Sequence, residues 1–109
     1  MTRYLLCILT IMIYSTAFTQ VRVVHFNAGW NSSNDVVWVD NLEDCKIKKI
    51  DIAEDKKAQG KHKISVVPTL IVFDGSVEIK RFEADISFSI KAKQEEIQEV
   101  INKLLVNKF

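Results

Sequence analysis

Few residues of the 109-residue chain carry side chains suited to covalent or metal chemistry, and they lie far apart in the sequence. The two cysteines are Cys7 and Cys45, and the two histidines are His25 and His62. A structural zinc site needs several such ligands at short, regular separations, which these four positions do not show. The sequence therefore predicts no metal site, and no motif in it indicates a cofactor.

Cys45 has two interpretations. It is either a small apolar residue at the entrance to a strand or a single thiol that exchanges with, or pairs to, another chain. Neighbouring lysines would lower the pKa of a thiol, whereas neighbouring acids would raise it. The lysines are Lys46, Lys48 and Lys49, and the acids are Glu43 and Asp44. We favour the packing role, because a reactive cysteine must be exposed.

Composition limits the classes of function. Lys and Arg number 15 against 14 Asp and Glu, so the chain has no basic excess to attract nucleic acid or anionic lipid. Hydrophobic residues make up 48% of the chain and charged residues 27%, which is typical of one globular domain.

Residues 1–20 have the pattern of a secretory signal peptide: a short basic start, an apolar run over 4–14 and a small-residue end. Cleavage is expected after Thr19 or close by. The alternative is an uncleaved membrane anchor, although a span needs about 20 apolar residues. Cleavage would leave residues 21–109 as a periplasmic or extracellular domain without membrane contact. Cys45 would then be its only thiol, so it would have no internal disulfide.

Hydrophobic patterning in residues 21–109 predicts alternating strands and helices, followed by a hairpin and a last helix. Strands are expected at 21–26, 47–52, 69–73 and 77–82, and helices at 34–43, 54–63 and 94–105. Asp74-Gly75 is a hairpin turn signal, and a bulge is expected near Lys80-Arg81.

Residues 84–91 alternate apolar and polar side chains, which is the pattern of a half-buried edge strand. The apolar members are Ile86, Phe88 and Ile90. Such an edge would suit self-association, so a structural or assembly role through residues 86–90 is one alternative function.

Two segments resemble the thioredoxin family. Residues 23–30 (VVHFNAGW) are similar to its first core strand and the Trp that leads into its active-site loop, and residues 66–75 (VVPTLIVFDG) are similar to its Val-Pro-Thr segment, central strand and turn. The resemblance implies an α/β fold of β-α-β-α-β-β-α order, with a central mixed sheet flanked by helices. His62 stands where the family has an aromatic residue and is expected to pack flat on a helix end.

The chain departs from the family just after Trp30. The redox motif Cys-x-x-Cys corresponds to Asn31, Ser32, Ser33 and Asn34, so both cysteines are replaced by Asn. Asn neither ionises nor exchanges disulfides. The resemblance therefore implies a degenerate active-site loop without dithiol chemistry.

The resemblance also places His25 where the family often has a buried carboxylate. His25 is either a neutral core histidine with a backbone partner or a base for Ser32 or Ser33. A serine nucleophile also needs an oxyanion hole and an orienting acid, and neither is visible in the sequence. We therefore favour the core role.

The resemblance further implies a cis bond before Pro68 and a peptide groove formed by Trp30, Asn31, Val67 and Pro68. The resulting hypothesis is an exported, non-catalytic module that binds an extended peptide or protein partner. The enzymatic alternative is a thiol-disulfide oxidoreductase that acts through Cys45.

Overall fold

The structure is a computed structural model, and it describes residues 20–108. The expected signal peptide, with Cys7 and the cleavage point after Thr19, lies outside this range. Within residues 20–108, no helix has both the length and the apolar character needed to cross a bilayer.

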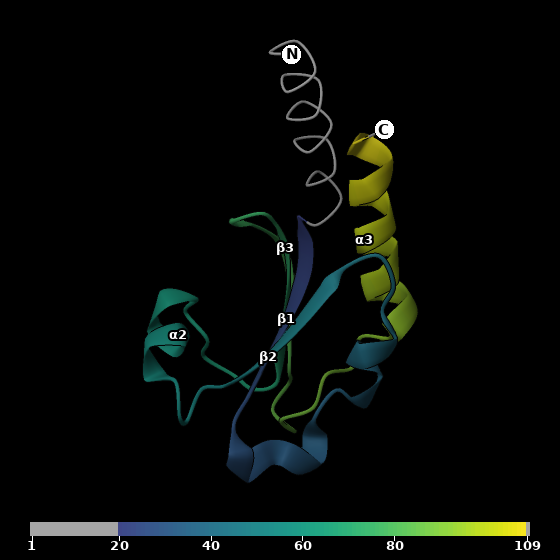
Figure 1. The fold of residues 1–109 in the computed structure, drawn as a ribbon. Helices are drawn as coiled ribbons and strands as arrows, with labels where there is room; N and C mark the ends of the chain where they lie inside the picture. The colour runs from purple at the N-terminus through teal and green to yellow at the C-terminus, as the bar shows by residue number, and fades with distance from the viewer. Residues whose placement is uncertain (1–19, 109) are drawn as a thin grey trace, which may run out of the picture.

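A four-stranded mixed sheet forms the centre of the domain (Figure 1). Its strands are β1 (Val21–Asn27), β2 (Lys46–Asp51), β3 (Thr69–Asp74) and β4 (Val77–Glu83), in the spatial order β2-β1-β3-β4. β1 runs parallel to β2 and antiparallel to β3, and β3 pairs antiparallel with β4. The expected α/β fold with a central mixed sheet is confirmed.

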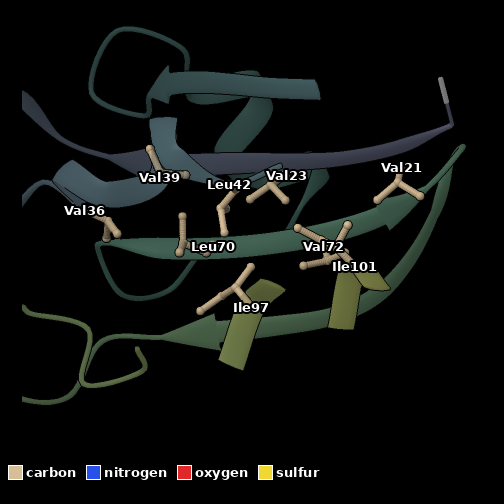
Figure 2. Close-up of a cluster of buried hydrophobic side chains, with 9 residues drawn as sticks. All are labelled: Val21, Val23, Val36, Val39, Leu42, Leu70, Val72, Ile97 and Ile101. Atoms are coloured by element: carbon tan, nitrogen blue, oxygen red, sulfur yellow. The ribbon is translucent and has the colours of Figure 1, made fainter. Parts of the chain in front are cut away.

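The two central strands are apolar on both faces because both faces are covered. Helix α3 (Gln94–Lys108) covers one face, and α2 (Lys56–Lys61) lies on the other side of the sheet (Figure 1). Figure 2 shows the core on the α3 side, where side chains from β1 and β3 meet Ile97 and Ile101. The fully buried members of the second core, on the α2 side, include Phe26 and Ile71.

The expected helix over 34–43 is wrong. Two short 3-10 helices, η2 (Gly29–Asn34) and η3 (Val37–Asn41), occupy this part of the chain. Asp35 and Val36 separate them with non-helical backbone angles, at φ −54°, ψ 142° and φ −79°, ψ 88°. The Val36 amide donates to His25 Nε2 at 3.2 Å, a tertiary bond that holds the backbone where the two 3-10 helices are separated.

The hairpin and its bulge are confirmed. Gly75 adopts φ +63° in the turn between β3 and β4. The pairing register then shifts: Val72 faces Lys80, whereas Phe73 faces Glu78. Ile79 is therefore the extra residue of the bulge, immediately before Lys80.

The expected edge strand over residues 84–91 is wrong, because this segment folds into turns. Asp85 organises it: its carboxylate accepts from the Ser87 amide at 2.8 Å, and its carbonyl accepts from the Phe88 amide at 3.1 Å. Phe88 adopts φ +59°. The three apolar side chains then diverge, since Ile86 is 98% exposed, Phe88 turns toward Trp30 and Ile90 packs against the core. Side chain–backbone bonds at Asp85 have overridden the alternating pattern.

Candidate functional site

The loop that follows β1 carries two neighbouring residues with opposite environments. Trp30 is 67% exposed, whereas the next residue, Asn31, is only 4% exposed. The Trp30 ring meets the Phe88 ring edge-to-face, with centroids 5.6 Å apart and planes at 84°. Two residues far apart in sequence therefore form an exposed aromatic pair.

Asn31 joins three segments of the chain through its side-chain amide. Nδ2 lies 3.1 Å from Asn27 Oδ1, 3.1 Å from the Phe88 carbonyl oxygen and 3.4 Å from the Val67 carbonyl oxygen. Oδ1 accepts from Asn34 Nδ2 at 2.8 Å. The two amide hydrogens are thus shared among three acceptors, of which the Val67 carbonyl is the most distant.

Asn27 supports this arrangement from the end of β1. Its Nδ2 donates to the Asn31 carbonyl oxygen at 3.0 Å and to the Asp35 carboxylate. The two serines of the loop, Ser32 and Ser33, are exposed. The polar interior of the loop is therefore built from asparagines.

A small groove of about 250 Å³ opens beside the aromatic pair. Trp30 and Phe88 form part of its wall, together with Val67, Ile52 and Lys56. Lys56 is the only charged residue in its lining.

Two expected members of the groove do not line it. Asn31 and Pro68 are both buried, and neither forms part of the wall. The Val67–Pro68 bond is cis, and the Pro68 carbonyl accepts from the Ala84 amide at 3.1 Å, which incorporates it into the sheet end. The Asn31 side chain points inward because its amide hydrogen-bonds to Asn27, Phe88 and Asn34 in the interior of the loop.

His25 is 4% exposed on the α3 face of β1, and its Nε2 accepts from the Val36 amide. Burial lowers its pKa, although Asp35, whose carboxylate oxygen lies 4.0 Å from Nε2, opposes this effect. His25 is therefore a neutral histidine with a backbone partner, as favoured. His25 and Ser32 both line a hollow of about 460 Å³. The Nε2 atom of His25 already accepts the Val36 amide, so it is not available as a base for Ser32.

Cys45 lies at the opposite end of the sheet from this loop. It immediately precedes Lys46, which pairs with Arg22 at the start of β1, whereas Trp30 follows Asn27 at the end of β1. The five strand steps between these ends correspond to about 17 Å. Cys45 is half-buried against the α3-side core, and burial, with a smaller effect of Asp44, raises its pKa to about 11.

His62 packs between aromatic rings, but it does not lie flat. Its ring meets Phe26 at 51° and Phe73 at 69°, with centroids 5.2 and 5.5 Å apart. Across residues 20–108, no three His, Cys, Asp or Glu side chains are grouped so as to hold a metal ion.

Sequence reasoning missed two site residues, Asn27 and Phe88. Asn27 ends a buried strand four residues before Asn31, and nothing local in the sequence shows that the two amides pair. Phe88 was assigned to an edge strand, and nothing local in the sequence shows that its ring reaches Trp30.

Comparison with known proteins supports the fold and gives no sequence family. No family model and no curated protein matches the chain. Among solved structures, it is similar to a single-residue mutant of thioredoxin from Halobacterium salinarum, with a TM-score of 0.63, 18% identity, and coverage of 81% of this chain and 77% of that chain. It is similar to a malaria parasite thioredoxin-2, with a TM-score of 0.63, 19% identity, and coverage of 77% and 82%. It is also similar to Schistosoma mansoni thioredoxin, with a TM-score of 0.61, 17% identity, and coverage of 86% and 85%. The chain therefore has a thioredoxin-like fold.

Proposed function

We propose that this chain is a redox-inactive thioredoxin-like module that binds an extended segment of a partner protein beside Trp30. One observation carries the proposal: Asn31 is buried and hydrogen-bonded at the position that resembles a reactive cysteine, while the adjacent Trp30 remains exposed next to a groove. The loop keeps a recognition surface and has no thiol within residues 31–34.

The chemistry of residues 31–34 supports a non-catalytic role. Asn31 and Asn34 hydrogen-bond to each other, where a dithiol would need two sulfurs within bonding reach. Disulfide exchange requires a thiolate. Cys45 does not substitute for one, because it lies at the other end of the sheet and its pKa is raised to about 11.

The groove supports recognition of an apolar side chain in an extended segment. Two aromatic side chains, Trp30 and Phe88, provide the exposed apolar area that anchors interfaces. The groove volume of about 250 Å³ suits one side chain rather than a drug-sized ligand. We propose that a partner inserts such a side chain while its backbone runs past Val67.

We also propose that the domain acts outside the cytoplasm, on the strength of the signal-like pattern in residues 1–20. A cell-fractionation experiment with N-terminal sequencing of the exported protein tests this. A new N-terminus at or near residue 20 supports export with cleavage, whereas recovery of the intact chain in the cytoplasm contradicts it.

A displayed library of random linear peptides, selected on the full-length chain, tests the binding function. Peptides bound by the wild-type chain should bind Trp30→Ala about 30-fold more weakly, because truncation of an aromatic anchor costs about 2 kcal/mol. Phe88→Asn should also weaken binding, because it removes the second aromatic ring. Asn is chosen as the replacement because it tolerates the left-handed backbone at this position.

Val37→Ala is the matched control, because Val37 is 81% exposed but does not line the groove. It should leave peptide affinity unchanged. Selection of peptides whose affinity is equal for wild type and Trp30→Ala, or a failure to enrich any peptide, contradicts the proposed function.

A further inference from the structure

A second hollow, of about 380 Å³, lies between the C-terminal end of α2 and the β3–β4 hairpin, and Figure 1 shows these two elements on the same side of the domain. Its lining contains four cationic side chains and a single carboxylate. The cations are Arg22, Lys61, Lys63 and Arg81, and the carboxylate is Glu78. This hollow is separate from the Trp30 groove, since Arg22 lies near the start of β1 and Trp30 follows its end.

The concentration of positive charge is local. Only one of the chain's charged residues, Arg3, precedes residue 20, so residues 20–109 carry 14 cations and 14 acids. Glu78 is already paired with Arg81, with Nη2 and Oε1 2.7 Å apart. Arg81 also donates to the carbonyl oxygens of His62 and Lys63, at 2.8 and 3.2 Å, and so caps the end of α2. Among the described residues that line the hollow, no second carboxylate remains to balance Arg22, Lys61 and Lys63.

Arg22 is held in place before any ligand arrives. Its guanidinium carbon lies 4.3 Å from the Phe73 ring centroid, and its Nε donates to the Gly75 carbonyl oxygen at 3.1 Å. That bond uses one of the three guanidinium nitrogens. The backbone of Lys63 is also fixed, at φ +53°, with its carbonyl bound by Arg81.

We propose that this hollow binds a tetrahedral oxyanion of the phosphate or sulfate class. A planar guanidinium engages two oxygens of such an anion at once, and ammonium groups add charge without a geometric constraint. Ser76, which also lines the hollow, supplies a neutral hydroxyl donor from the hairpin turn. Preorganised Arg22 reduces the ordering cost of binding.

His62, which also lines the hollow, reports on binding. Burial lowers its pKa first, and the nearby Lys61, Arg22 and Arg81 lower it further, with Glu78 opposing them. A bound dianion would offset these cations. The pKa of His62 should therefore rise on binding.

NMR titration of the full-length chain tests the proposal, with the His62 ring and the Gly75 and Ser76 amides as probes. Inorganic phosphate, inorganic sulfate and phenyl phosphate are the three ligands, and sodium chloride at equal ionic strength controls for screening. We expect saturable shifts of these probes and a raised pKa of His62. Tighter binding of phenyl phosphate would indicate an organic ester as the ligand, whereas equal binding would indicate the free anion, and either result supports the site.

Two variants locate the effect. Arg22→Gln should weaken binding about tenfold, because one charge-assisted contact is lost. Lys63→Asn should also weaken anion binding, because it removes a positive charge. Asn is chosen because it tolerates the left-handed backbone at this position. Lys48→Gln is the matched control, since it removes a charge from β2 outside the hollow. Shifts that chloride reproduces, or that survive in Arg22→Gln and Lys63→Asn together, overturn the proposal.

Discussion

Replacement of Asn31 by Ala should be among the most destabilising single changes in the loop after β1. The side chain makes contacts of 3.1, 3.1 and 2.8 Å with Asn27, Phe88 and Asn34, and a longer one of 3.4 Å with Val67. A protein hydrogen bond contributes about 1 kcal/mol net, and a buried group left without a partner costs about 1–3 kcal/mol. We therefore expect the free energy of unfolding to fall by about 3 kcal/mol.

Urea denaturation followed by far-UV circular dichroism measures this change, with Asn34→Ala as the matched comparison. Asn34 is only partly buried and contributes one bond of this network, so its truncation should cost about 1 kcal/mol. Limited proteolysis adds a local readout. Because Asn31 holds the Phe88 carbonyl oxygen, residues 84–91 should be cleaved faster in Asn31→Ala than in Asn34→Ala.

A loss of unfolding free energy in Asn31→Ala no greater than that in Asn34→Ala would contradict this prediction, as would equal resistance of residues 84–91 to cleavage in both variants. Either result would mean that packing of the two aromatic rings, Trp30 and Phe88, holds the segment without the amide.

Three further predictions concern sulfur and protonation. The double variant Asn31→Cys/Asn34→Cys should form a disulfide within the loop, because the side chains at these two positions already contact each other; a variant that stays fully reduced would count against the correspondence with the redox motif. Cys45 in the folded chain should react with iodoacetamide at pH 8 about 100-fold more slowly than Cys45 in the unfolded chain, since folding raises its pKa from 9.0 to about 11. Equal rates would show that the folded thiol is exposed. Burial in the fold lowers the pKa of His25, so the unfolded chain takes up a proton at this histidine more readily than the folded chain, and the free energy of unfolding should fall as pH drops below 6.5. His25→Gln keeps an acceptor for the Val36 amide and should flatten this pH dependence in denaturation curves. An unchanged slope would show that another group causes the dependence.

The strands and the last helix could be predicted because their patterns and their environments agree. In β3, the continuous apolar residues 70–73 matched burial on both faces of the sheet, and in β1 the alternation of Val23 with Val24 sends neighbours to opposite cores. Ile97 and Ile101 are four residues apart, so they share one face of α3 and reach the same core. At these positions the local conformational preference and the tertiary contacts favour the same secondary structure.

The segment after β1 failed because its backbone is set by a residue distant in sequence. Residues 34–43 lie in the connection between two parallel strands, and such a connection is most often a helix. β-branched residues there disfavour an α-helix, and the bond from the Val36 amide to His25 fixes the backbone at the break between η2 and η3. A buried imidazole eleven residues earlier thus decides where the helix is interrupted, and no local pattern records that.

Residues 84–91 failed for a related reason. The alternation of Ile86, Phe88 and Ile90 is a strand pattern only if the backbone is extended. Asp85 bonds to the backbone of Ser87, and Phe88 is placed at φ +59°, so the three side chains point to solvent, to Trp30 and to the core. The same turn creates the aromatic pair of the proposed binding groove, which therefore could not have been found from the sequence.

Under the proposed correspondence of position 31 with a reactive cysteine, the Asn at this position has a structural consequence as well as a chemical one. A thiolate nucleophile must remain accessible to its substrate, so its loop cannot bury it. An amide has two donors and one acceptor oxygen, and burial stabilises it only when partners satisfy them. Asn31 meets that condition by bonding to Asn27, Asn34 and Phe88, which draws residues 84–91 onto the loop. Under the proposed function, Asn31, which stands in place of a nucleophile, also holds Phe88, a residue that lines the recognition groove.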